Sequence, residues 1–330
     1  MALLGEQLVI KLWDSLIDKG VGSLLKPWQI RREGQAMIDV RKAEMLQMAQ
    51  VELDALAIKR GEKALLPSGE IVDVESRSDN QLTIGFISNK SIQTIKAEEI
   101  RKEVSVNKAI SYAEQELLQD AQEPSEKSID GDWLLRWREG ASSVSSEELT
   151  SLWGKVLAGE SKGPGTYSLR TLDFLKHLSK DEASLIESLM AFVFEGFIYK
   201  GDEQILSANN ITFDKLLNLQ ELGLLSGVDS FGLEKNWKSS SKDAFTLAIV
   251  SNERLILVTN PDPKRVLKIQ PVCLLTTIGL QLYHLIKISP NIGMVSAIAE
   301  KIKSQGFTAQ IGDIVEITGS QIKYKNLTAV

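Results

Sequence analysis

Residues 144–193 read VSSEELTSLWGKVLAGESKGPGTYSLRTLDFLKHLSKDEASLIESLMAFV, and this stretch predicts three short helices. Ser145 and Glu148 fit a capping box, in which each side chain bonds the other residue's free backbone N–H at a helix start. Ser168 is expected to cap the second helix, and Ser179 with Glu182 repeats the capping box before the third. Apolar residues recur at helical spacing in each segment: Leu149, Leu152, Trp153, Val156 and Leu157; Leu169, Leu172, Leu175 and Leu178; Ile186, Leu189, Met190 and Val193.

Glycines separate these helices. Gly159 is expected to end the first one, and Gly163-Pro164-Gly165 to turn the chain. Each apolar stripe needs a partner to bury against, so three stripes joined by short turns predict a compact helical bundle. Trp133 and Trp137 lie four residues apart on one helical face, and we expect them to pack into the same bundle.

The composition is that of a folded protein of two or three domains, with 43% hydrophobic and 25% charged residues in a chain of 330. The net charge is −6, and residues 61–210 carry 16 basic against 26 acidic side chains. This acidic middle disfavours broad nucleic-acid binding there. One cysteine, Cys273, precludes an internal disulfide, and Glu6 disfavours a secretory leader. No apolar run reaches about 18 residues, so we expect a cytoplasmic protein.

Two N-terminal helices are predicted at residues 3–19 and 28–60. The second has an apolar stripe that is the candidate face for a homo-oligomer or a protein partner, made of Met37, Val40, Met48, Val51 and Ile58. A stripe this long without internal caps predicts a helical hairpin, a coiled coil or an oligomer contact, and an ordinary bundle helix is the simplest interpretation. Basic residues also permit peripheral contact of residues 1–60 with the inner membrane, although interleaved acidic residues oppose anionic lipid.

Residues 64–96 change character and predict a small β insertion. Three groups have the β-branched and aromatic content of strands, and turn-like segments separate the first two groups. The groups are Ile71, Val72 and Val74; Leu82, Ile84 and Phe86; and Ile92 with Ile95. Helix is expected again from about residue 97 to 121, followed by a polar linker at 120–130 that contains Pro124.

The C-terminal part predicts a winged helix. A helix that ends in Leu222-Gly223-Leu224-Leu225 is followed by strands at 245–249, 255–258 and 266–269, with a turn at Pro261-Asp262-Pro263 between the last two. An apolar helix then opens at Leu275, capped by Thr276 or Thr277. Three basic residues on the expected wing are the candidate contacts to nucleic-acid phosphates: Lys264, Arg265 and Lys268.

The sequence contains no recognisable constellation for catalysis, metal binding or a cofactor. His177 and His284 lie in helical apolar patterns without neighbouring Cys or His, whereas a zinc site needs three or four such ligands at short spacing. Cys273 is interpreted as a buried small hydrophobe, and no glycine-rich phosphate loop is present. Arg170 is expected to form a structural ion pair with Glu160 or Asp173.

Several segments together carry a resemblance: Asp132-Trp133-Leu134-x-Arg136-Trp137, Val144-Ser145-x-Glu147-Glu148-Leu149, Leu152-Trp153-Gly154-Lys155-Val156-Leu157-Ala158-Gly159-Glu160, Pro164-Gly165-x-x-Ser168-Leu169-Arg170-Thr171-Leu172 and Leu175-x-x-Leu178-Ser179. Over most of its length the chain resembles an uncharacterised bacterial family of unknown function. Residues 130–193, through Glu147-Glu148-Leu149 and Leu178-Ser179-Lys180-Asp181-Glu182-Ala183, are similar to the abortive-infection alpha (Abi-alpha) family of phage-defence proteins. The β insertion has no counterpart in either family, and the resemblance implies no catalytic residue.

The sequence therefore predicts a mainly α protein with long N-terminal helices, a central helical bundle, a small β insertion and a C-terminal α+β winged-helix-like module. The expected domains are 1–63, 64–96, 97–195 and 196–330. The function implied by the resemblance is anti-phage defence without enzymatic activity, acting through self-association or through binding a partner or a membrane surface. The alternative is a nucleic-acid-binding regulator that uses the winged helix.

Overall fold

The protein divides into two compact units, Met1–His177 and Leu178–Val330. The division falls inside the stretch of three predicted helices, so that the third helix belongs to the second unit. The computed structural model describes the chain at residues 4–18, 36–66, 68–73, 84–120, 122–229, 233–239, 241–286, 288–318 and 321–330.

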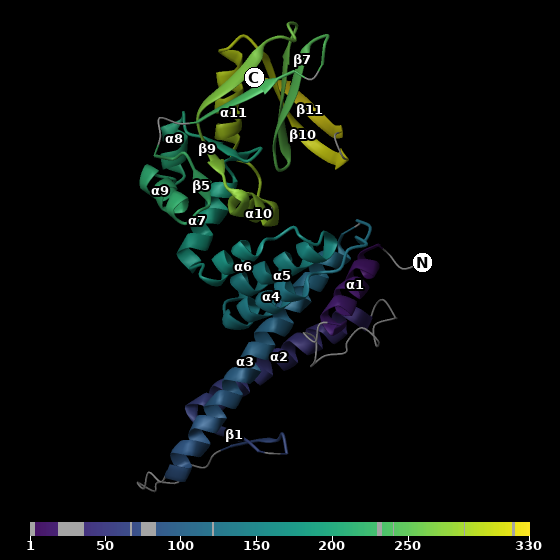
Figure 1. Ribbon diagram of the computed structural model, residues 1–330, viewed down its shortest axis with the longest axis vertical. Helices are drawn as coiled ribbons and strands as arrows, with labels where there is room; N and C mark the ends of the chain where they lie inside the picture. Colours follow the sequence, from purple (N-terminus) through teal and green to yellow (C-terminus); the bar gives the residue numbers. More distant parts are fainter. Residues whose placement is uncertain are drawn as a thin grey trace. The chain divides into compact units, whose positions relative to one another are not determined.

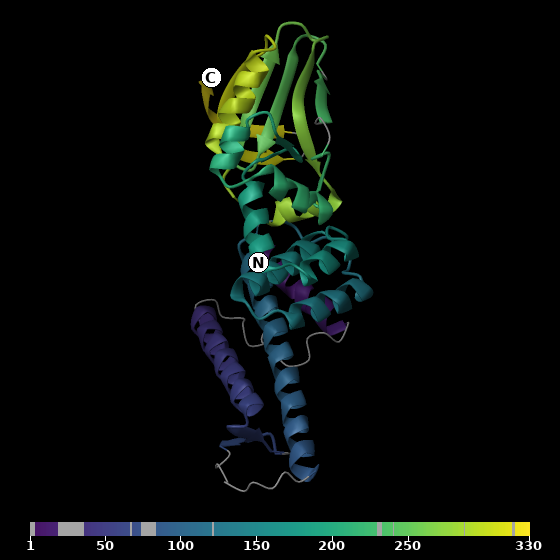
Figure 2. The same ribbon diagram turned by 90° about the vertical axis from the view of Figure 1, so that its left-hand side faces the viewer.

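The first unit is built around one long helix, α3 (Figure 1). Its N-terminal half runs beside α2 (Figure 2), and its C-terminal half contacts α1, α4 and α5. The elements of this unit are α1 (Leu4–Asp18), α2 (Ala36–Arg60), β1 (Lys63–Leu65), β2 (Ile71–Asp73), α3 (Ile84–Leu118), α4 (Gly131–Ser143), α5 (Glu147–Lys162) and α6 (Leu169–Lys176).

Side-chain caps set where the short helices begin. Ser168 accepts the N–H of Thr171 at the start of α6, as predicted. Ser179 and Glu182 form the predicted capping box at the start of α7 (Lys180–Met190), the first helix of the second unit. These interactions span only three residues, so the local sequence determines them.

Both predicted ends of α5 are wrong. The helix begins one residue later than expected, with Ser146 and not Ser145 accepting the N–H of Leu149. It also continues past Gly159 to Lys162. A Cβ at Gly159 would lie 2.6 Å from the Tyr167 ring. Close packing therefore accounts for this glycine, and helix termination does not.

The β insertion is smaller than predicted. β1 and β2 form an antiparallel hairpin, whose Leu65 backbone N–H and carbonyl bond the Gln93 side chain at 3.0 Å each. The strands predicted around Ile84 and Ile92–Ile95 are wrong, because these residues lie in α3, and Leu82 lies outside the described residues. Helical spacing there buries Ala97 and part of Ile100 against Ala55 and Ile58 of α2, and this packing outweighs the strand propensity of isoleucine.

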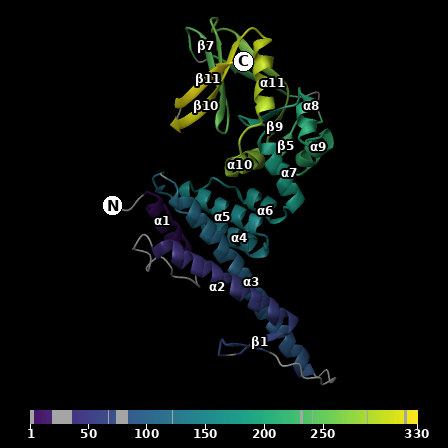
Figure 3. The same cartoon turned by 180° about the vertical axis from the view of Figure 1, so that it is seen from behind.

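The second unit is built on two antiparallel sheets. One has the strand order β11-β10-β8-β7, and the other has β3-β4-β9-β5 with β6 also paired to β9. Helix α11 contacts β8, β9 and β10, and thus strands of both sheets (Figure 3). After α7, the elements are β3 (Val193–Phe194), β4 (Phe197–Tyr199), α8 (Glu203–Ala208), α9 (Phe213–Glu221), β5 (Leu225–Ser226), β6 (Leu233–Lys238), β7 (Phe245–Ser251), β8 (Arg254–Asn260), β9 (Val266–Leu275), α10 (Thr277–Leu285), α11 (Ile292–Lys303), β10 (Thr308–Thr318) and β11 (Gln321–Ala329).

These two sheets overturn the predictions of a mainly α protein and of a C-terminal winged helix. Residues 261–265 do join β8 to β9, as the turn at Pro261-Asp262-Pro263 predicted. The two strands then enter different sheets, because β8 pairs with β7 and β10 while β9 pairs with β4, β5 and β6. The wing of a winged helix would require them to pair with each other. Which strands pair depends on contacts between residues far apart in sequence, and the residues of the turn do not determine it.

Helix α10 and its N-terminal cap form as the sequence predicted, although the surrounding fold is not a winged helix. Thr276 is its N-cap and accepts the N–H of Gly279. The Thr276 hydroxyl also donates to the carbonyl of Gly223, at 2.6 Å. A Cβ at Gly279 would lie 2.4 Å from the carbonyl oxygen of Leu224. The glycine in this position therefore lets α10 approach the turn after α9.

Candidate functional site

The predicted apolar stripe of α2 lies partly against α3. Met48 and Ile58 are 8% and 2% exposed, and Ile58 belongs to the small core with Ala55 and Ala97. Val51 is 38% exposed. The side chains of Met37 and Val40 lie outside the described residues. A helical hairpin, one of the arrangements that the stripe predicts, therefore uses Met48 and Ile58 within the chain.

Helices α2 and α3 form an antiparallel helical hairpin, and ion pairs between them show its register. Lys59 of α2 lies 3.7 Å from Glu98 of α3. Lys108, further along α3, pairs with Glu52, which is earlier in α2. The pairs are partly or largely exposed, so each contributes about 0–1 kcal/mol to stability. Their value here is geometric, because they show which residues of α2 and α3 face each other.

Other apolar side chains of the hairpin point to solvent. Leu53 and Leu56 on α2 are 61% and 40% exposed, and Ile92 and Ile95 on α3 are 47% and 63% exposed. We call these four residues the hairpin surface. Leu53 and Leu56 are three residues apart and so share a face of α2. In the sequence Leu53 widens the predicted stripe and Leu56 lies outside it; in the structure both lie away from the face that α3 covers.

The three basic residues of the predicted wing are not arranged as a wing. Arg265 lies over the Phe307 ring, 5.1 Å from its centroid, and donates to the Gln305 carbonyl. Lys268 forms an ion pair with Glu234 at 3.1 Å. Lys264 is exposed in the connection from β8 to β9. Two of the three side chains thus have structural partners within the second unit.

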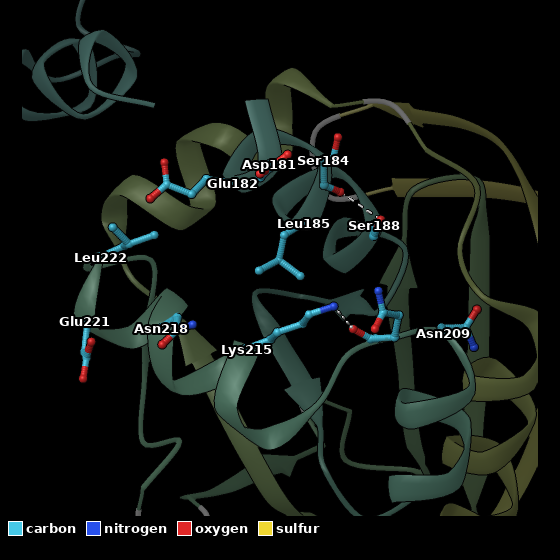
Figure 4. Close-up of a pocket in the computed structure, with 11 residues that line it drawn as sticks. Asp181, Glu182, Ser184, Leu185, Ser188, Asn209, Lys215, Asn218, Glu221 and Leu222 are labelled. Atoms are coloured by element: carbon cyan, nitrogen blue, oxygen red, sulfur yellow. Dashed lines mark hydrogen bonds between the residues drawn. The ribbon is translucent and has the colours of Figure 1, made fainter. Parts of the chain in front are cut away.

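A cleft of about 650 Å³ lies between α7 and α9 in the second unit (Figure 4). Leu185 and Lys215 lie in the middle of it. Most of the residues that line it have polar side chains, and several of these side chains bond the backbone nearby. Lys215 Nζ donates to the Asn210 carbonyl at 2.9 Å, and Glu182 takes part in the α7 capping box. The polar groups of the cleft therefore stabilise helix ends, and they present no paired acid and base.

A partly buried carboxylate, that of Glu195, occupies the turn between β3 and β4. Glu195 and Gly196 have φ angles of 43° and 78°, the left-handed pair of a two-residue hairpin turn in which Asn-Gly is preferred. Burial raises the pKa of Glu195, although the indole N–H of Trp237, at 3.2 Å, and the nearby charge of Lys235 act in the opposite direction. The Trp237 bond gives a structural reason for glutamate at this strained position.

The indole resonance of Trp237 should therefore titrate with Glu195, with a midpoint above the ordinary glutamate pKa of 4.5. Because the folded-state pKa exceeds the unfolded one, the contribution of Glu195 to stability is fully present below the unfolded value. It is lost as pH rises through the folded pKa. The measurement is a pH series of ¹H–¹⁵N spectra; Trp237 is the single tryptophan after residue 178.

One variant and one internal control test this assignment. Lys235→Met removes a charge that lowers the pKa of Glu195, so the Trp237 midpoint should move further up. Glu234 is the internal control, since hydrogen bonds from Lys268 and Asn236 lower its pKa. A Trp237 midpoint at or below 4.5 would show that burial does not control the pKa of Glu195. A midpoint that Lys235→Met does not move would contradict the assigned effect of the Lys235 charge.

The structure also places the other residues that the sequence analysis considered as candidates. Cys273 is fully buried, and burial raises the pKa of its thiol to about 11, in agreement with a small hydrophobe. His177 is exposed at the C-cap of α6. The Glu160 carboxylate is held by backbone groups and not by the predicted ion pair with Arg170, whose side chain is exposed. The Glu160 carboxylate accepts backbone N–H groups from Gly165 at 2.6 Å and from Tyr167 at 3.0 Å.

Neither a membrane span nor a metal cluster occurs in the described ranges. None of the helices placed there combines the length and apolar character needed to cross a bilayer. Nor do three or more His, Cys, Asp or Glu side chains gather as potential metal ligands in that part of the chain.

Comparison with protein families finds a match for part of the chain. Residues 89–204 match a family described as "Protein of unknown function (DUF2806)". This confirms the predicted resemblance to an uncharacterised family over that segment, which includes most of α3, all of α4–α7 and the β3–β4 hairpin. No curated protein and no solved structure matches the chain.

Proposed function

We propose that this chain is a bacterial anti-phage defence protein of the abortive-infection type, which assembles with further copies through the α2–α3 hairpin and catalyses no reaction. The observation that supports assembly is the exposure of large apolar side chains on the hairpin, above all Leu53 and Ile95 at 61% and 63%. The similarity of residues 130–193 to the abortive-infection alpha family supports the defence role.

The hairpin has a thin core of its own. Among the described residues away from the bundle, its buried cluster consists of Ala55, Ile58 and Ala97, with Leu65, Ile71 and Ile100 packed partly against it. Apolar area removed from water contributes about 25 cal/mol per Å². A second hairpin that covers Leu53 and Leu56 would therefore add stabilisation where the single chain provides little.

Self-association accounts for the hairpin surface better than a membrane does. Leu53 is flanked in sequence by Glu52 and Asp54, and Ile95 is followed by Glu98 and Glu99. Anionic lipid would repel these carboxylates. A second protein copy can instead place its own lysines against them, as Lys59 and Lys102 already do within the hairpin.

Replacing both leucines by Leu53→Glu and Leu56→Glu should dissociate the oligomer, because the added carboxylates of both copies would be forced into the contact without partners. The measurement is molar mass by light scattering over a range of protein concentrations. In cells, the same double variant should lose protection in a phage plating assay. Circular dichroism should remain unchanged, since neither side chain supports the core between α2 and α3.

The matched control is Leu135→Glu. Leu135 is 56% exposed on α4, so it has comparable exposure outside the hairpin and should affect neither mass nor protection. A monomeric unmodified protein at every concentration would contradict assembly. An oligomer that the double variant leaves intact would contradict the assigned surface.

A further inference from the structure

Strands β10 and β11 form a two-stranded ribbon that continues beyond the rest of their sheet (Figure 3). β10 pairs with β8 only from Thr308 to Asp313, but with β11 as far as Thr318. The base of the ribbon is anchored, because Asp313 pairs with Arg254 at 2.9 Å and the N–H of Ile314 donates to the Glu253 carbonyl at 2.8 Å. Beyond this point β11 is the only strand beside β10 in the described residues.

The ribbon has one apolar and one charged face. Ile317 lies opposite Ile322, and Ile314 lies opposite Tyr324. Of these, Ile317 and Tyr324 are 53% and 44% exposed. The register shifts between Ile314 and Glu316, so Glu316 lies opposite Lys323 on the other face, where the two form an ion pair at 2.6 Å. An isolated two-stranded ribbon is marginally stable, so this one would gain from a third strand.

β11 is also the edge of the sheet in the described part of the chain. Its outer backbone groups are therefore available to another strand. Lys323, whose side chain is 70% exposed, and Lys325 lie on one face, and the nine residues of β11 include no carboxylate side chain. An antiparallel pair of β11 copies centred on Tyr324 would place Lys323 opposite Lys325, which is unfavourable. The charge pattern favours an acidic strand instead.

We propose that β11 binds an extended segment of a partner protein by strand addition, and that this segment alternates apolar and acidic residues. Its apolar side chains continue the face of Ile322 and Tyr324, and its carboxylates lie beside Lys323 and Lys325. Main-chain hydrogen bonds supply affinity in this mode, and the alternate side chains supply specificity. The surface is separate from the hairpin surface of the first unit, so the inference goes beyond the proposed function.

The test uses the full chain and a fluorescent synthetic peptide of alternating valine and glutamate, as long as the nine residues of β11. Fluorescence anisotropy should show binding that weakens with added salt. Hydrogen exchange should slow at the β11 amides that face outward. Lys323→Gln with Lys325→Gln should weaken binding about tenfold, and a peptide of alternating valine and lysine should not bind.

Two further double variants show whether the peptide binds at β11 or at another surface. Lys242→Gln with Lys264→Gln removes two exposed lysines elsewhere in the second unit, and binding should be unchanged. Leu53→Glu with Leu56→Glu should also bind the peptide normally, whatever its mass. Absence of binding, equal binding of both peptides, or equal binding by the Lys323/Lys325 variant would overturn the proposal. So would β11 protection without peptide that grows with protein concentration, since the occupant would then be a second copy.

Discussion

Trp137→Ala is expected to lower the free energy of unfolding of the first unit by about 3–5 kcal/mol. Trp137 is completely buried, and its indole N–H donates to the Trp153 carbonyl of α5 at 2.9 Å. Truncation would leave a cavity between α4 and α5 and remove this bond. The neighbouring packing is too tight for simple repair, because a Cβ at Gly140 would lie 2.0 Å from the Trp153 ring.

Hydrogen exchange followed along the whole chain is the appropriate measurement, since the two units need not unfold together. Amides of α4 and α5 should lose protection in Trp137→Ala, while amides of β7 to β10 should keep theirs. Leu135→Ala is the control on the same helix, at 56% exposure, and should change stability by less than about 0.5 kcal/mol. Similar losses for the two variants would contradict the assigned core.

Glu160→Ala should release the loop between α5 and α6. Glu160 is 2% exposed and accepts the backbone N–H groups of Gly165 and Tyr167. The Tyr167 N–H is buried, and leaving it without an acceptor costs about 1–3 kcal/mol; Gly165 is exposed, so its N–H can bond water instead. Tyr167 also presents its carbonyl to the Trp133 indole at 2.8 Å, so loss of the carboxylate should loosen the start of α4 as well. Unfolding in denaturant and exchange of the Gly165 and Tyr167 amides measure this.

Glu160→Gln should be less destabilising than Glu160→Ala, because the amide keeps one acceptor oxygen. Burial raises the pKa of Glu160, so the carboxylate form carries a desolvation cost that glutamine avoids. Glu126→Ala, at an exposed position before α4, serves as the control and should be nearly neutral. If Glu160→Ala were equally neutral, water would have to replace the carboxylate in holding the loop.

Local interactions made parts of this structure predictable. The caps at Ser168 and Ser179 and the turn at residues 163–167 involve partners a few residues apart, and they form as predicted. The α2 stripe predicted a buried face, and Met48 and Ile58 are indeed buried. The exposure of the hairpin surface could not be predicted in this way. Leu53 and Leu56 are defined by what α3 leaves uncovered, and only the register shown by Lys59–Glu98 reveals that.

The errors arose where a local pattern fits two tertiary arrangements. Ile92 and Ile95 are three residues apart, which suits a helix face, but isoleucine is also favoured in strands. In the structure these residues are helical, and Gln93 between them bonds the backbone of Leu65 in β1 from α3. In the same way, the Leu275–Gly279 motif predicted a helix correctly, but the fold around it depends on which sheet β9 enters.

The sequence by itself therefore determined that three helices form within residues 144–193, because capping and helical periodicity act within about four residues. Their ends were less well predicted, and Val193, expected in the third helix, lies in β3. Only the tertiary structure decided their assignment: α5 and α6 belong to the first unit, and α7 belongs to the second. It also decided that β8 and β9, joined by a short turn, pair in different sheets. Strand partners lie far apart in sequence, as Thr308 and Thr259 do. The free energy that favours one pairing over another comes from contacts between such distant residues, which a pattern within a few residues cannot reveal.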